Sequence, residues 1–239
     1  AGSLSGTQNI CSNQTSVFAS TSTGGTWSTS DATVATIDAS GNITPISTGS
    51  AIMSYTVTGT GGCADAIATR SITISAGPNS GIITGTQQLC INSTANLTTT
   101  GTGGSWSSSN TSVATVNSSG TITTVGTGNA IISYNVNGTG GCPNATATLN
   151  IAVAAVLNAG TLSGNQNLCA NSTSSFSSSA IGGAWTSNNT AVATIDASGN
   201  ITPVAAGNTT MSYTITGTGG CADAVATRDV FITAPPQAG

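Results

Sequence analysis

One unit of sequence occurs three times in this chain, with a period of 79 residues and no insertion or deletion. Three positions mark the period in every copy: Cys11, Cys90 and Cys169; Trp27, Trp106 and Trp185; Cys63, Cys142 and Cys221. A fixed period is typical of structural units that stack with one repeated geometry. It predicts three domains, at residues 1–79, 80–158 and 159–239. Because Ala238 and Gly239 are in phase with Ala1 and Gly2, we expect the array to continue, within a longer chain or into another subunit.

Charged side chains are almost absent, which excludes most catalytic chemistry. The chain has no His, Lys or Glu and contains only two Arg and six Asp, and residues 80–158 contain no charged side chain at all. General acid–base catalysis and activated nucleophiles usually need one of the missing residue types. We therefore expect no enzyme activity, no catalytic residue and no cofactor.

The same composition argues against nucleic-acid binding and membrane insertion. Phosphate binding depends on Lys and Arg, whereas this chain has a formal net charge of -4. The longest apolar run, Ile151 to Leu157, is far shorter than the roughly 18 residues that a membrane-spanning helix needs. We expect neither a nucleic-acid partner nor a membrane span.

Six cysteines at two constant phases indicate disulfides. A metal site would need paired Cys-x-x-Cys or His ligands, which the sequence does not contain, so no metal ligand is predicted. Disulfides imply an oxidising compartment. This favours an extracellular or cell-surface protein.

Each copy alternates apolar and polar residues in short runs that Gly, Asn, Asp and Ser separate, a pattern typical of antiparallel strands. In the first copy the runs predict strands at Ser3–Ile10, Thr15–Ser20, Gly25–Ser30, Val34–Ile37, Asn42–Ser47, Ala51–Thr58 and Ala66–Ser75. Seven strands in about 79 residues predict a two-sheet sandwich whose core includes the Trp. At Asp38–Gly41 we expect a tight turn, because Asn117 serves at the Asp38 position in the second copy.

Three segments of the first copy carry a resemblance to a known family: Trp27–Asp31, Val34–Thr44 and Gly49–Tyr55. They resemble the bacterial Ig-like group 2 domain, and the likeness recurs around Trp106 and Trp185. The resemblance implies an all-β fold of three tandem Ig-like sandwiches in an elongated array. It also implies a role outside the cell, because members of the family occur in tandem in intimin- and invasin-type adhesins and in repetitive surface proteins.

The disulfide pairing has two solutions. Pairing within each repeat would join Cys11 to Cys63, Cys90 to Cys142 and Cys169 to Cys221. However, the five predicted strands between Cys11 and Cys63 place these residues at opposite ends of a sandwich, roughly 25 Å apart, and a disulfide needs Cα atoms within about 7 Å. Head-to-tail bridges Cys11–Cys142 and Cys90–Cys221 avoid this, and leave Cys63 and Cys169 for neighbouring subunits or repeats. The strand count leaves both schemes open.

The surface predicted for this chain is polar but uncharged. Only 3% of the residues are charged, against about a quarter in ordinary domains, so little repulsion keeps copies apart. Two features of the sequence would modify this surface. Asn13, Asn92 and Asn171 each begin an Asn-x-Thr sequon and are candidate glycosylation sites. For Arg70 and Arg228, on the apolar side of a strand, we expect side chains that reach solvent or a carboxylate such as Asp65 or Asp223.

Together these features predict a structural extracellular protein whose repeats build a filament, stalk or sheath by self-association and disulfide stapling. Its partners would be copies of itself. The alternative is a cell-surface adhesin or carbohydrate-binding repeat region, with host or surface glycans as partners. That alternative normally requires exposed aromatic clusters or a metal, and the three Trp are better explained as core residues.

Overall fold

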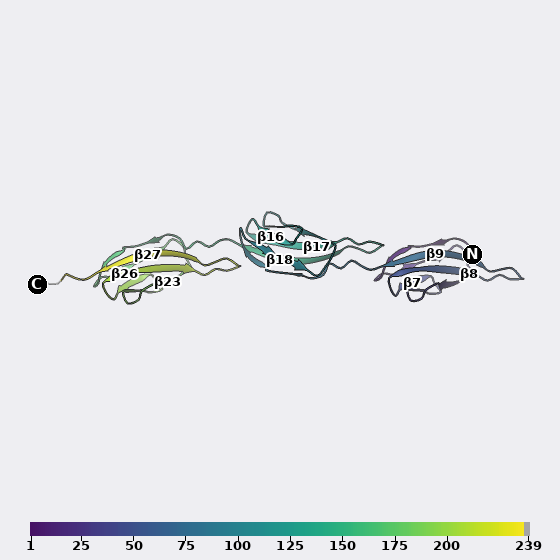
Figure 1. Ribbon diagram of the computed structural model, residues 1–239, viewed down its shortest axis with the longest axis horizontal. Coiled ribbons are helices and arrows are strands. Elements are labelled where there is room, and N and C mark those ends of the chain that lie inside the picture. The colour runs from purple at the N-terminus through teal and green to yellow at the C-terminus, as the bar shows by residue number, and fades with distance from the viewer. Residues whose placement is uncertain (237–239) are drawn as a thin grey trace.

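A computed structural model describes residues 1–236 and contains strands but no helix in that part of the chain. The strands form three similar groups that follow one another in a row (Figure 1). The first group comprises β1 (Leu4–Ser5), β2 (Asn9–Cys11), β3 (Ser16–Val17), β4 (Ala19–Ser20), β5 (Thr26–Thr29), β6 (Ala35–Ile37), β7 (Asn42–Pro45), β8 (Gly49–Val57) and β9 (Ala66–Ser75).

The other two groups repeat this order. The second comprises β10 (Ile83–Thr84), β11 (Gln88–Cys90), β12 (Thr94–Asn96), β13 (Thr98–Thr99), β14 (Ser105–Ser108), β15 (Ala114–Val116), β16 (Thr121–Thr124), β17 (Gly128–Val136) and β18 (Ala145–Ala154). The third comprises β19 (Leu162–Ser163), β20 (Asn167–Cys169), β21 (Ser174–Ser175), β22 (Ser177–Ser178), β23 (Ala184–Ser187), β24 (Ala193–Ile195), β25 (Asn200–Pro203), β26 (Gly207–Ile215) and β27 (Ala224–Thr233).

Each group is a two-sheet sandwich of the Ig type. In the first, β2-β9-β8-β5 form one sheet, β3-β7-β6 form the other, and β1 pairs with β4. The two sheets correspond to the division of strands in immunoglobulin domains. The prediction of an all-β array of three tandem Ig-like sandwiches is confirmed, and the array is elongated (Figure 1).

The strand expected at Ser3–Ile10 is in fact two strands in different sheets. β1 pairs antiparallel with β4, whereas β2 pairs parallel with β9. The chain changes sheet at Gly6, which has a φ of 131° and no room for a Cβ atom beside the Phe18 ring. The antiparallel expectation is therefore wrong for β2, because a strand that crosses to the other sheet meets β9 in the same direction.

The core follows the alternation seen in the sequence. Along β8 the side chains of Ala51, Met53 and Tyr55 are buried, as expected for residues on one face of a strand. Trp27 is half-buried and packs against this core, with its ring centroid 4.8 Å from that of Tyr55. The Tyr55 hydroxyl accepts a hydrogen bond of 2.8 Å from the Gly25 backbone N–H, so the aromatic pair also positions the start of β5.

Arg70 lies on the inner side of β9, but its partners are not the carboxylates expected from the sequence. Its guanidinium donates hydrogen bonds to the backbone carbonyls of Gly6 (2.8 Å) and Leu4 (3.3 Å) and lies 5.6 Å from the centroid of the Phe18 ring. Arg228 makes the equivalent contacts in the third repeat, with Leu162, Gly164 and Phe176. Of the two expectations, solvent or an Asp partner, the Asp partner is wrong, because the chain crossing at Gly6 presents carbonyl groups to the guanidinium.

The turn expected at Asp38 is present and is held by the side chain of that residue. The Asp38 carboxylate accepts hydrogen bonds from the side-chain amide of Asn42 (2.7 Å) and from the backbone N–H groups of Asn42 (2.9 Å) and Ser40 (2.8 Å). These donors, first of all the Asn42 amide, lower the pKa of Asp38. Asp196 has the same arrangement in the third repeat.

Acid should therefore destabilise the first repeat through this turn. A carboxyl whose pKa is lower in the folded state stabilises the protein above its unfolded pKa of about 4, and this stabilisation is lost as pH falls through the folded value. Between about pH 6 and about pH 2, we expect the melting temperature of the first repeat to fall less in Asp38→Asn than in the parent chain. Differential scanning calorimetry at several pH values measures this. Asn117, at the same turn in the second repeat, shows that Asn fits the site; an unchanged acid dependence in the variant would contradict the assignment.

Candidate functional site: the junctions between repeats

Two disulfides join successive repeats. Cys11 is bonded to Cys142 and Cys90 to Cys221, with Cα–Cα distances of 4.6 and 4.7 Å. The structure thus has the head-to-tail scheme, one of the two that the sequence left open. The reason is the one given by the strand count: Cys11 ends β2 at the end of its sandwich that faces the second repeat, and the loop between β8 and β9 projects from the opposite end (Figure 1).

The first half of each junction is the end of a short parallel strand. Cys11, the last residue of β2, pairs with Ser75, the last residue of β9. The Ser12 backbone N–H donates to the Ser75 carbonyl (2.9 Å), and the Gln14 N–H donates to the Cys11 carbonyl (2.9 Å). The cysteine therefore lies beside the point where the chain leaves for the next repeat, and its side chain is fully buried.

The second half is the loop between the two longest strands of the next repeat, residues 137–144. The Asn144 side chain accepts a hydrogen bond from the Gly138 N–H (2.9 Å), and the Cys142 N–H donates to the Thr139 carbonyl (3.1 Å). Gly141 has a φ of 85°, in the left-handed region. These features give the loop a defined shape that presents Cys142 to the preceding sandwich.

The paired glycines allow the loop to approach the preceding repeat closely. A Cβ atom on Gly141 would overlap the Asn9 carbonyl oxygen, and one on Gly140 would overlap the Ser75 side chain. The second junction repeats this, since a Cβ atom on Gly220 would lie 2.5 Å from the Gln88 carbonyl oxygen. Only glycine fits at such a contact with a positive φ. Each junction is thus a covalent bond set within a close-packed contact between two sandwiches.

Two of the six cysteines predicted to form disulfides have no disulfide partner in this structure. Cys63 is exposed, and Cys169 is half-buried. Each lies at a position whose equivalents in the other repeats form the disulfides between repeats. Cys63 is equivalent to Cys142 and Cys221, and Cys169 is equivalent to Cys11 and Cys90.

The three candidate glycosylation sites lie beside the junctions. Asn13, Asn92 and Asn171 are exposed and fall in the turn that follows the first cysteine of each repeat. Asn92 has a φ of 61°, a conformation that Asn tolerates better than most residues. Glycosylation at these positions stays a prediction.

Residues 1–236 contain no group of three or more His, Cys, Asp or Glu side chains that could hold a metal ion. Within that range there is also no helix long and apolar enough to cross a membrane.

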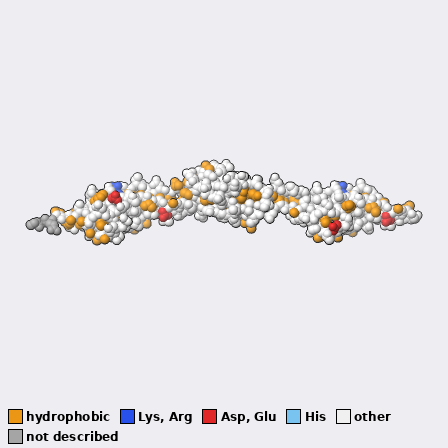
Figure 2. Space-filling model, viewed as in Figure 1, with side chains coloured by type: hydrophobic (Ala, Val, Ile, Leu, Met, Phe, Trp, Pro, Cys, Tyr) orange, Lys and Arg blue, Asp and Glu red, His pale blue; other side chains and the backbone are white. Residues whose placement is uncertain are grey.

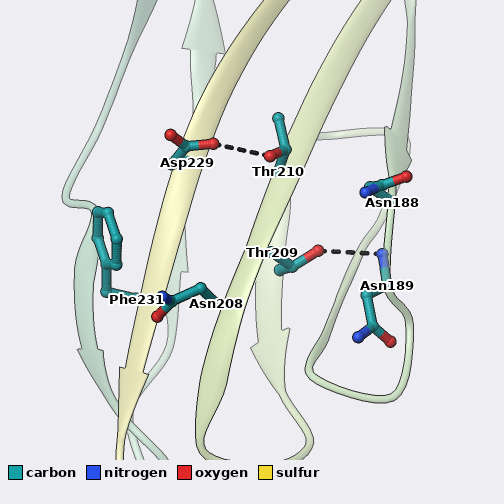
Figure 3. A pocket seen from close by; sticks show the side chains of 7 residues that line it. All are labelled: Asn188, Asn189, Asn208, Thr209, Thr210, Asp229 and Phe231. Carbon is teal, nitrogen blue, oxygen red and sulfur yellow. Dashed lines mark hydrogen bonds between the residues drawn. The ribbon is translucent and has the colours of Figure 1, made fainter.

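A polar depression of about 320 Å³ is lined by residues of the third repeat (Figure 3). In it, Thr210 donates a hydrogen bond of 2.7 Å to Asp229, and the ring of Phe231 is 40% exposed. The first repeat has Ser71 and Thr73 at the positions of Asp229 and Phe231. No motif in the sequence pointed to this site, although the third copy departs from the other two at the positions of Asp229 and Phe231.

Comparison with known proteins identifies no family. No protein-family model matches the chain. No curated protein matches it either.

Solved structures with a similar arrangement include surface proteins. Domains 1–6 of the surface layer protein SbsC are 17% identical, with a TM-score of 0.31, over 90% of this chain and 35% of that one. Invasin, a bacterial integrin-binding protein, is 12% identical, with a TM-score of 0.43, over 96% and 58% of the two chains. A C-terminal fragment of intimin is 20% identical, with a TM-score of 0.37, over 62% of each chain. This chain spans about a third of the SbsC structure, and likenesses this remote support no conclusion about function.

Proposed function

We propose that this chain is a structural extracellular protein whose Ig-like repeats build a surface filament, stalk or sheath by self-association and disulfide stapling. The observation that carries the proposal is the pair of disulfides between repeats, Cys11–Cys142 and Cys90–Cys221. Disulfides persist outside the cytoplasm. In most small secreted domains they reinforce one core, whereas here they are used to fix each sandwich to the next.

Two further observations support the proposal. The segments that resemble the bacterial Ig-like group 2 domain, around Trp27, Trp106 and Trp185, are typical of tandem domains in bacterial surface proteins. In addition, charged side chains are few and scattered on an otherwise uncharged surface (Figure 2), which gives little electrostatic repulsion between copies. Both features suit a protein that functions in an assembled state.

The disulfides also set how far the chain can be stretched. The shortest covalent path from residue 1 to residue 239 crosses from Cys11 to Cys142, returns along the chain to Cys90 and crosses to Cys221. Repeats that unfold under tension would therefore release only part of the chain. A stalk with this connectivity therefore lengthens less under tension than one without disulfides between its repeats.

Single-molecule pulling from the two termini tests this mechanical role. The protein used is Cys63→Ser/Cys169→Ser, which retains both internal disulfides and cannot join to other copies through the remaining thiols. We expect full extension to about 300 Å under oxidising conditions and about 800 Å after reduction, from roughly 3.5 Å per extended residue. Equal extension in the two conditions would show that the two disulfides between repeats are not formed, and would count against the proposal.

The depression on the third repeat favours a second candidate function, saccharide binding by an adhesin. An exposed aromatic ring beside amide and carboxylate groups can pack on a sugar and bind its hydroxyls, and Phe231 lies beside Asn208 and Asp229 (Figure 3). Saccharide binding by the Phe231→Ala variant tests this alternative, with Thr73→Ala, at the equivalent position of the first repeat, as the control. Binding that is lost in Phe231→Ala but kept in Thr73→Ala would favour an adhesin over a purely structural role.

A further inference from the structure

We propose that Cys63 of one chain and Cys169 of a second copy form a head-to-tail disulfide, in the same docked arrangement that joins the repeats within the chain. This inference rests on the proposed structural function and specifies its assembly contact. Its basis is that the two ends of the rod carry the two complementary halves of a junction that the chain itself completes twice.

The first half is already in the docked conformation. In the loop of residues 58–65, Gly59 donates its N–H to Asp65 (2.9 Å), as Gly138 does to Asn144 in a completed junction. Gly62 has a φ of 85°, the same value as Gly141. Since the loop at residues 58–65 contacts no preceding repeat, docking does not impose this shape. A preformed loop loses little conformational entropy on association.

The contact surface of this loop is free. Cβ atoms placed on Gly61 and Gly62 would meet nothing within 4 Å, whereas those on Gly141 and Gly220 would meet the backbone of the preceding repeat. Cys63 is exposed, whereas its counterpart Cys142 is only 9% exposed in its junction. The loop thus presents, uncovered, the surface that its two counterparts bury.

The second half is formed at the other end of the rod. Cys169 ends β20 and pairs with Thr233, the last residue of β27, as Cys11 pairs with Ser75. The Ala170 N–H donates to the Thr233 carbonyl (3.0 Å), and the Ser172 N–H donates to the Cys169 carbonyl (2.9 Å). The backbone carbonyl of Asn167, which is equivalent to Asn9, accepts a hydrogen bond of 3.0 Å from the Asn165 side-chain amide. It lies where Gly62 of another copy would pack, as the Asn9 carbonyl lies beside Gly141. None of these residues of the second half is charged, so no like charge meets Asp65 of the incoming loop.

The bond forms by thiol–disulfide exchange with a small-molecule disulfide such as oxidised glutathione. The Cys63 thiolate attacks that disulfide and releases one small thiol, and the Cys169 thiolate of the second copy then displaces the other. Two protein thiols are oxidised to one disulfide, and one small disulfide is reduced to two thiols. Because each rod has one end of each kind, this heterologous contact extends into linear filaments.

Incubation of the 239-residue chain with oxidised glutathione tests the proposal. We expect a ladder of chain multiples on non-reducing gels, with Cys63–Cys169 as the dominant intermolecular peptide in mass spectrometry. An equimolar mixture of Cys63→Ser and Cys169→Ser proteins should stop at the dimer, since each retains only one half of the junction. A statistical mixture of Cys63–Cys63, Cys169–Cys169 and Cys63–Cys169 would overturn the proposal, because it would indicate merely exposed thiols.

A matched pair of glycine variants tests docking separately from thiol chemistry. Gly62→Asn keeps a residue that tolerates a positive φ but adds a side chain where the Asn167 carbonyl of the other copy must approach. We expect it to slow Cys63–Cys169 formation at least about tenfold. Gly24→Asn is the control, because Gly24 also has a positive φ (78°) and open space around it, and its counterparts Gly103 and Gly182 keep that open space in the two completed junctions. Equal rates for the two variants would refute docked pairing. The pulling experiment uses a variant without either thiol, so it can succeed or fail independently.

Discussion

Removal of the Cys90–Cys221 disulfide, by Cys90→Ser/Cys221→Ser, is expected to destabilise the third repeat by about 4 kcal/mol. Cys90 is held beside Ala154 at the end of β18, so the disulfide fixes the loop between β26 and β27 of the third repeat to the folded second one. When the third repeat unfolds, the chain from residue 155 to Cys221 is a closed loop with reduced conformational entropy. Loss of the bond frees that loop and stabilises the unfolded state. Calorimetric or denaturant unfolding of the full chain measures the change.

The matched control is Cys63→Ser/Cys169→Ser, which removes two cysteines and no disulfide. We expect its unfolding to match that of the parent chain under conditions that prevent association. The first repeat, held by Cys11–Cys142, should keep its transition in both variants. A third repeat whose stability does not change in Cys90→Ser/Cys221→Ser would mean that the junction contact, without the covalent bond, already provides the constraint.

Truncation of Phe18 is expected to destabilise the first repeat by about 3–5 kcal/mol, the usual cost of a Phe→Ala change in a core. The Phe18 side chain is 1% exposed and lies between the two sheets, with its ring centroid 6.4 Å from that of Trp27. Phe18→Ala leaves a cavity at this point. It also removes the ring over which the Arg70 guanidinium lies. Urea unfolding of the variant measures the loss.

The second repeat provides the control for this prediction. It has Leu97 where the first has Phe18, and Leu149 where the first has Arg70, and both Leu side chains belong to its core. We expect the double change Phe18→Leu/Arg70→Leu to cost only about 1–2 kcal/mol, less than the two single changes together, because the pair acts as a unit. Strictly additive single changes would show that the cation and the ring contribute independently.

Much of the fold could be predicted from the repeat and from local alternation. The constant phases of Cys and Trp indicated three equivalent units, and runs such as Ala51–Thr58 predicted long strands of the sandwich because every second side chain is apolar. The turn at Asp38 could also be predicted, since its hydrogen bonds join residues at most four apart in the sequence. These features depend on near neighbours in the chain, which a sequence displays directly.

Other features depend on chain segments that meet only in space. After the chain crosses to the other sheet at Gly6, β2 pairs in parallel with β9, whose residues are more than sixty positions away in the sequence. The carbonyl groups that bind Arg70 are equally distant from it in the sequence. No local pattern marks such contacts. The sequence therefore suggested solvent or a carboxylate as the surroundings of this guanidinium, whereas in the structure it donates to backbone carbonyls.

The junctions show the division most clearly. By itself the sequence determined that each repeat carries two cysteines. The predicted strand count favoured opposite ends of a sandwich for them, but it left the pairing open because one strand more or less reverses that parity. Only the tertiary structure decided that Cys11 reaches Cys142 and Cys90 reaches Cys221. The physical reason is that a disulfide requires two Cα atoms within a few ångströms, a distance set by how one folded sandwich stacks on the next.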